Sequence, residues 1–134
     1  MPHSNLVLVD ASIWIKFFRA PASSEAEALD VLLSAGAVAT CAPIRAEVVS
    51  GAQTKREFDS LRDLFGGLVD LELPQDLWPH VEEHRFALAR RGYQIPIVDL
   101  MIALTAQAHQ AAVWTLDQDF THMATTIPIA AFRP

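Results

Sequence analysis

The chain has 134 residues, of which 51% are hydrophobic and 19% charged, so it is not an intrinsically disordered protein, and we expect one domain over residues 1–134. Its only cysteine, Cys41, excludes an intramolecular disulfide and a cysteine-ligated zinc site. The net charge of −6 argues against broad electrostatic binding to nucleic acid, unless bound cations reverse the local field.

Short apolar runs alternate with longer segments of helical spacing. In chain order they predict a strand over 6–9, helices over 12–18 and 24–34, a strand over 37–41, helices over 43–51 and 54–65, a strand over 68–73, helices over 75–91 and 96–109, and a strand over 111–115. Ser24 can cap the second helix, and Pro43 and Pro96 suit first helical turns. This alternation predicts a three-layer α/β fold with a central, mostly parallel sheet.

No segment of the chain predicts secretion or membrane insertion. Only four apolar residues, 6–9, precede Asp10, and this is too short for the core of a signal peptide. No apolar run approaches the roughly 20 residues of a membrane helix. We therefore expect a soluble, cytoplasmic protein.

Four acidic residues fall where predicted strands end or the following helices begin. Asp10 closes the first predicted strand, and Asp117 follows the last one. Asp99 lies in the first turn of the helix that begins near Pro96, and Glu47 lies one turn into the helix after the second strand. Ligands of such sheets bind beyond the carboxyl ends of the strands, so we expect these acids to lie close together.

A cluster of carboxylates suits Mg²⁺ or Mn²⁺, and divalent ions promote phosphodiester hydrolysis by activating water and stabilising developing charge. Repulsion between the acids should raise some of their pKa values. Each acid also has an ordinary interpretation as a helix cap, a partner of the helix dipole or a solvated side chain. Glu47 favours the site most, because Ala46, Val48 and Val49 predict a largely buried helix. Four acids at one sheet edge therefore indicate a metal-dependent nuclease.

Four short motifs follow one another over nearly the whole chain. They are LVDAS at 8–12, APIRAEV at 42–48, IVDLMIA at 97–103 and WTLDQDF at 114–120. Together and in this order they resemble the motifs of PIN-domain ribonucleases and, within that family, of the VapC-type toxins of bacterial toxin–antitoxin modules.

The resemblance implies that one acid in each motif is catalytic and coordinates the metal: Asp10, Glu47, Asp99 and Asp117. It also implies that Asp119 is an auxiliary acid, although this residue could instead cap a helix containing Phe120. The hydroxyls of Ser12 and Thr115 would orient carboxylates or water, or they could be only a helix cap and a strand end.

The resemblance further implies a divalent-metal-dependent endoribonuclease that inhibits translation or growth, binds a cognate antitoxin protein and forms a homodimer. An apolar cluster near the N-terminus predicts either core or a partner surface: Ile13, Trp14, Ile15, Phe17 and Phe18. Basic residues that could contact the RNA backbone are Lys16, Arg19, Arg45, Arg90 and Arg91. Two alternatives stay open: a catalytically inactive module of this fold that binds protein or RNA, and a structure-specific DNA nuclease.

Two other kinds of site fit the sequence less well. His80 and His84 match the H-x-x-E-H pattern of some zinc proteases, but the pattern is short and no third ligand completes it, so we interpret it as an exposed helix face. Phosphatases with an aspartate after the first strand need a second acid two residues later, where this chain has Ser12.

Overall fold

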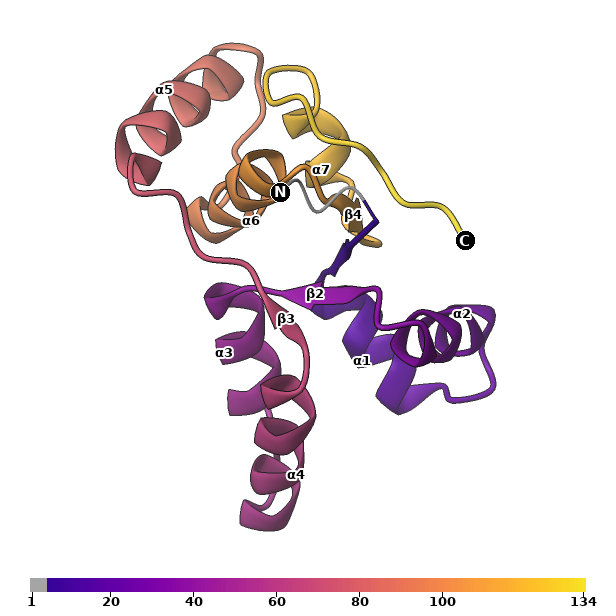
Figure 1. The fold of residues 1–134 in the computed structure, drawn as a ribbon. Coiled ribbons are helices and arrows are strands. Elements are labelled where there is room, and N and C mark those ends of the chain that lie inside the picture. The colour runs from indigo at the N-terminus through magenta and orange to yellow at the C-terminus, as the bar shows by residue number, and fades with distance from the viewer. Residues whose placement is uncertain (1–4) are drawn as a thin grey trace.

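The computed structural model describes residues 5–134 as a four-stranded sheet with helices on both faces. Its elements are β1 (Val7–Val9), α1 (Ala11–Arg19), α2 (Ser24–Ser34), β2 (Val38–Thr40), α3 (Ala42–Ser50), α4 (Lys55–Gly66), β3 (Val69–Asp70), α5 (Leu77–Arg90), α6 (Ile97–His109), β4 (Ala112–Trp114) and α7 (Asp119–Met123). Figure 1 shows α1 to α4 on one side of the sheet and α5 to α7 on the other, which confirms the predicted three-layer α/β fold. No helix in the described part is long and apolar enough to cross a membrane.

The strand order is β3–β2–β1–β4, and each neighbouring pair is parallel. β1 pairs with β2 through Val7 and Val38, and with β4 through Val9 and Trp114. The chain therefore moves outward from β1 to β3 and then crosses back to the other side of β1. The direction of winding reverses between β1 and β4, and a crevice for ligands lies beyond the carboxyl ends of two such strands.

The strands are shorter than the apolar runs that predict them. β3 covers Val69 and Asp70 instead of 68–73, and both side chains are exposed at the edge of the sheet. Leu71 still donates its backbone N–H to the carbonyl of Thr40 at 2.8 Å, after which the chain leaves the sheet. Helical spacing does not predict the short helix α7, because five residues are too few to show it, and a helix containing Phe120 enters the sequence analysis only as an alternative role for Asp119.

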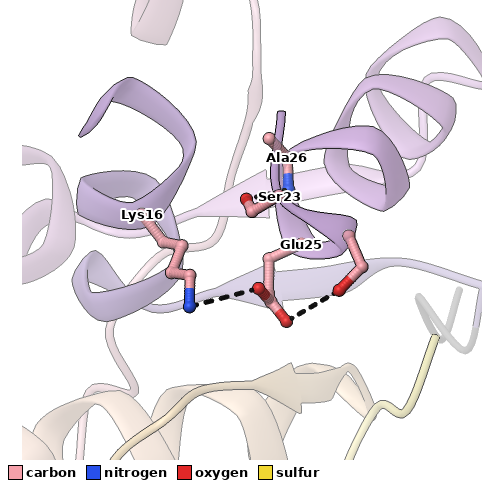
Figure 2. A network of polar contacts seen from close by, with 5 residues as sticks. Lys16, Ser23, Glu25 and Ala26 are labelled. Atoms are coloured by element: carbon pink, nitrogen blue, oxygen red, sulfur yellow. Dashed lines mark hydrogen bonds and ion pairs between the residues drawn. The ribbon is translucent and has the colours of Figure 1, made fainter. Parts of the chain in front are cut away.

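The corner between α1 and α2 is held by polar contacts (Figure 2). The Ser23 hydroxyl accepts a hydrogen bond from the Ala26 N–H at 3.1 Å, so the cap of α2 lies one residue before the predicted Ser24. Lys16 of α1 forms an ion pair with Glu25 of α2 at 3.4 Å. Lys16, one of the basic residues predicted to contact RNA, is therefore paired with an acid of α2.

The apolar cluster of α1 divides between the core and the surface. Ile13 and Trp14 are fully buried, and the Trp14 ring packs against Phe65 of α4 with 4.8 Å between ring centroids. Ile15 and Phe18 are 42% and 45% exposed. The core interpretation is confirmed for Ile13 and Trp14. The partner-surface interpretation stays a prediction for Ile15 and Phe18, which form an exposed apolar surface on the other face of α1.

After α7, residues 129–133, here called the C-terminal segment, return to the outer edge of β4 (Figure 1). Val113 donates its N–H to the Ala130 carbonyl at 2.9 Å, and its own carbonyl accepts from the Phe132 N–H at 2.8 Å. The Phe132 ring contacts the Trp114 ring, with centroids 5.3 Å apart. The segment is therefore fixed beside the strand that leads to the predicted acids.

Candidate active site

Asp10 stands where β1 and β4 end side by side. Its N–H donates to the Trp114 carbonyl at 2.9 Å, which continues the pairing of the two strands by one residue. Asp10 is 8% exposed. It is also the N-cap residue of α1. A buried carboxylate needs donors, and here they come from the first turn of α1 and from the residue after β4.

Two hydroxyl groups hold the Asp10 carboxylate. Oδ2 accepts from Ser12 Oγ at 2.8 Å and from Thr115 Oγ1 at 2.9 Å. The same hydroxyls accept backbone N–H groups of the β4–α7 loop, because Leu116 N donates to Ser12 Oγ and Asp117 N donates to Thr115 Oγ1, both at 3.0 Å. Ser12 and Thr115 therefore join the start of α1 to the loop that carries the next acid.

Three aspartates on the α6 and α7 side converge. Among residues 5–134, Asp99, Asp117 and Asp119 form one group in which each acid offers one carboxylate oxygen, and these three oxygens lie within 4.8 Å of one another. Asp99 lies in the first turn of α6, where its N–H donates to the Pro96 carbonyl at 3.1 Å. Asp117 Oδ1 accepts from the Asp119 N–H at 2.9 Å, which fixes the entry into α7. Asp119 lies inside α7 and is not its cap, contrary to the alternative considered for it, because the helix begins after Gln118.

The pKa of Asp99 is raised to about 7, first by burial and then by the charges of Asp117, Asp10, Asp119 and Glu47. The pKa of Glu47 is also raised, by partial burial and by Asp10. The expected repulsion within the cluster is therefore present. The charges of the other four acids thus act on Asp99, and the charge of Asp10 acts on Glu47.

Glu47 differs from its prediction in one respect. The helix α3 buries Ile44, Val48 and Val49, whereas Ala46 and Glu47 are exposed. Nine residues at 3.6 per turn cannot all face the core, and Glu47 falls at the border of the buried face. The expected burial of this part of the helix is wrong, but the border position leaves the carboxylate open to the crevice and within the electrostatic reach of Asp10.

The cluster has the chemistry of a site for a hard divalent cation. In the described part of the chain, the ion pairs of Lys16, Lys55 and His80 involve other acids, so no basic side chain pairs with the five carboxylates. Carboxylate oxygens gathered at this spacing are the ligands that Mg²⁺ and Mn²⁺ prefer. A divalent cation fits the residues present.

The two histidines of the zinc-protease pattern are engaged elsewhere. His80 Nε2 lies 3.0 Å from Asp76 Oδ2, and His84 Nδ1 lies 3.2 Å from Thr126 Oγ1. Their ring centroids are 6.4 Å apart. Burial and His80 lower the pKa of His84. This arrangement agrees with the interpretation of the pattern as part of a helix surface.

Two hollows adjoin the acids, and the sequence pattern predicts neither. A cavity of about 300 Å³ lies between α7 and the C-terminal segment and reaches Asp117 and Arg133. A groove of about 350 Å³ runs past Glu47 and is lined by the exposed Ile15 and Phe18 of α1. Arg133 was not among the basic residues considered for RNA binding, because the bridge that returns it to β4 has no signal in the sequence.

Comparisons with known proteins agree with this geometry. The family model of the PIN domain matches residues 7–125. Ribonuclease VapC11 of Mycobacterium tuberculosis is 33% identical over 134 residues, which cover 96% of this chain and 100% of that protein. Similar folds occur in VapBC2 from Rickettsia felis bound to a DNA fragment from their promoter (TM-score 0.72, 23% identity, 91% of this chain and 96% of that chain). They also occur in VapBC-1 from nontypeable Haemophilus influenzae (TM-score 0.74, 19% identity, 95% and 96%).

The family match covers the strand ends, both helices that carry Glu47 and Asp99, and the loop with Asp117. The match to VapC11 extends over almost the entire chain. The resemblance drawn from the four motifs is confirmed. This chain belongs to the PIN-domain family and, within it, to the VapC ribonucleases.

Proposed function

We propose that this chain is a divalent-metal-dependent endoribonuclease and the toxin of a toxin–antitoxin pair, which stops translation and growth by hydrolysing RNA in the cytoplasm. The observation that carries the proposal is the group of five carboxylates at one sheet edge, with none of them paired to a basic side chain within residues 5–134. The identity to a ribonuclease, VapC11, over almost the full chain supports the choice of RNA.

In this proposal Asp99, Asp117 and Asp119 hold Mg²⁺ or Mn²⁺, and Asp10 and Glu47 complete the site. The bound cation supplies an activated water and stabilises negative charge at phosphorus and at the leaving oxygen. The hydroxyls of Ser12 and Thr115 orient the Asp10 carboxylate and act as positioning residues. Asp119 contributes as an auxiliary acid.

The charge of the protein is compatible with an RNA substrate when the site is loaded. The chain carries a net charge of −6, and five acids around an empty site would repel a phosphodiester. Divalent cations reverse the sign of the field at the point where the phosphate approaches. RNA binding should therefore depend on the cation as well as on basic side chains.

We place the cognate antitoxin in the groove beside Glu47. Its lining includes the exposed apolar side chains of Ile15 and Phe18 and the buried Leu61. Exposed apolar surfaces of this kind mark contacts with other proteins. A basic side chain of the antitoxin could reach Glu47 from the groove and oppose cation binding. A similar fold occurs in VapBC-5 from Mycobacterium tuberculosis, a member of the VapBC family of toxin–antitoxin systems. We also expect a homodimer from the family.

The test is cleavage of total cellular RNA by the purified chain in Mg²⁺ or Mn²⁺, compared with EDTA and with Asp99→Asn. Asp63→Asn is the matched control, because Asp63 is an exposed acid of α4 outside the cluster. We expect Asp99→Asn to slow cleavage at least about a hundredfold with the fold retained, while Asp63→Asn cuts like the wild type. Normal cutting by folded Asp99→Asn would remove Asp99 from the mechanism.

The same assay separates the alternatives when single-stranded RNA, structured RNA and flap DNA are compared. Cleavage of flap DNA alone would replace the ribonuclease by a structure-specific DNA nuclease. Binding of RNA or protein without cleavage of any substrate in either metal would favour the inactive interaction module.

A further inference from the structure

The cavity beside Asp117 has the size and position of a subsite next to the reacting phosphate. Its volume of about 300 Å³ lies at the lower end of the range for small-molecule pockets, which starts at roughly 300 Å³. It is bounded by β4, the loop after it, α7 and the C-terminal segment. Since Asp117 lies at its rim, a group bound there is a direct neighbour of the acid cluster.

We propose that this cavity binds the nucleotide adjacent to the cleaved phosphodiester, with the base inside and its backbone phosphate at Arg133. The inference rests on the proposed ribonuclease function and adds a subsite that fixes where RNA is cut. A nucleotide is the occupant that fits, because the cavity combines an apolar wall, polar groups and one cation beside a site for phosphodiesters.

The lining matches the faces and edges of a base. Phe132 is half-buried and contributes apolar surface on which a single-stranded base can stack or pack, and the buried Phe120 lines the same wall. Gln118 and Thr121 supply an amide and a hydroxyl that can each donate and accept hydrogen bonds with a base edge. In the described part of the chain, neither of these two side chains has a hydrogen-bond partner, so both are open to a ligand.

Arg133 brings the positive charge that the acid cluster lacks. It is exposed at the cavity and forms no ion pair within residues 5–134, although the chain has an excess of acids. A guanidinium group binds phosphate oxygens through two parallel hydrogen bonds. Arg133 can therefore hold a phosphate at a fixed separation from the cluster.

The wall that carries Arg133 is fixed to the sheet. The hydrogen bonds of Val113 with Ala130 and Phe132, together with the ring contact of Phe132 with Trp114, hold the segment immediately before Arg133. β4 thus carries the cavity wall on its outer edge and leads to Asp117 at its end. Because the two are parts of one rigid unit, the subsite and the cluster keep a constant spacing, as sequence-selective cleavage requires.

Two variants probe the two halves of the nucleotide. Arg133→Gln removes the phosphate contact, and Ala124→Trp fills the cavity from the end of α7 without changing an acid. Arg56→Gln is the charge-matched control, because Arg56 is exposed on α4 and lines neither hollow. Circular dichroism and thermal unfolding identify any variant that fails to fold. If Ala124→Trp does not fold, Arg133→Gln still tests the proposal, because Arg133 is exposed and its replacement leaves the core unchanged.

Binding is measured with a short fluorescent single-stranded RNA in Ca²⁺, which binds carboxylate oxygens and leaves the acid cluster unmutated, and cleavage is measured with a pool of random RNA in Mg²⁺. We expect Arg133→Gln to weaken binding about tenfold, to reduce the salt dependence by about one phosphate contact, and to raise KM with kcat unchanged. Ala124→Trp should flatten the base preference at one position beside the cut. A merely structural role would instead lower cleavage of all sequences equally.

The proposal would be overturned if Arg133→Gln and Ala124→Trp both matched the control Arg56→Gln in RNA binding, KM and base preference. Failure of the proposed function gives a different result, because wild-type protein then cuts no RNA in either metal. Binding that still depends on Arg133 would in that case support the cavity as an RNA site of a non-cleaving module.

Discussion

The two sides of the acid cluster give a carboxylate opposite surroundings: hydrogen-bond donors on one side and other acids on the other. On the β1 side, Asp10 is buried but accepts hydrogen bonds from Ser12 and Thr115. On the α6 side, Asp99 accepts no hydrogen bond from the described residues and faces other acids, which together with burial raise its pKa to about 7. One carboxylate is stabilised by the protein itself, and the other is stabilised only by a proton or a cation. The site is thus preorganised on one side and dependent on its ligand on the other.

The largest expected effect is the gain in stability on metal binding, which should depend on Asp99. Mg²⁺ at a hundred times its Kd should raise the free energy of unfolding of the wild type by about 2.7 kcal/mol, because the cation binds only the folded chain. Asp99→Asn should lose most of this gain, and Asp63→Asn should keep it. Urea unfolding with and without Mg²⁺ measures the difference. Equal stabilisation of Asp99→Asn and wild type would show that the cation binds without Asp99.

The Asp10 side should instead be sensitive to its hydroxyl donors without any metal. Thr115→Val removes a donor to Asp10 and an acceptor for the Asp117 N–H, and should lower the free energy of unfolding in EDTA by about 2 kcal/mol. Urea unfolding provides the value. Thr125→Val is the control, since its hydroxyl bonds an exposed carbonyl and its loss should change stability by less than about 0.5 kcal/mol. Similar values for both variants would mean that Asp10 does not rely on Thr115.

The smallest effect is the pH dependence of the metal-free protein. The pKa of Asp99 rises from its ordinary value near 4 to about 7 on folding, so its contribution to stability is present at low pH and is lost as the pH rises towards 7. Wild type should therefore lose stability relative to Asp99→Asn between about pH 4 and pH 7 in EDTA. Solvent around this half-exposed group keeps the effect modest. Parallel pH curves for the two proteins would contradict the raised pKa.

The position of most acids in the site was predictable from the sequence, because an acid at the end of an apolar strand is recognised from a few neighbouring residues. Asp10, Asp99 and Asp117 follow from where elements begin and end, and the parallel sheet then brings them together. The exposure of Glu47 was not predictable from its apolar neighbours, since hydrophobic composition does not say where the border of a buried face falls. The two donors of Asp10 came from family resemblance and needed the structure for their geometry.

The cavity and Arg133 could not be predicted for a different reason. They depend on a single parallel bridge between Val113 and Ala131, formed by a segment with no alternation or helical spacing. Contacts between a strand and an irregular segment leave no periodic trace in a sequence. The same holds for β3, which the apolar run predicts as six residues and the sheet edge limits to two.

That bridge also bears on how the protein stays in solution. A parallel sheet has two edges whose unpaired backbone groups can join the strands of another molecule and start aggregation. Here one edge is the two-residue β3 with the exposed charge of Asp70, and the other is covered by residues 130–132 lying along β4. A chain cut before Ala130 would expose the unpaired backbone groups on the outer edge of β4. The C-terminal segment therefore protects the sheet from edge-to-edge self-association, in addition to lining the cavity beside Asp117.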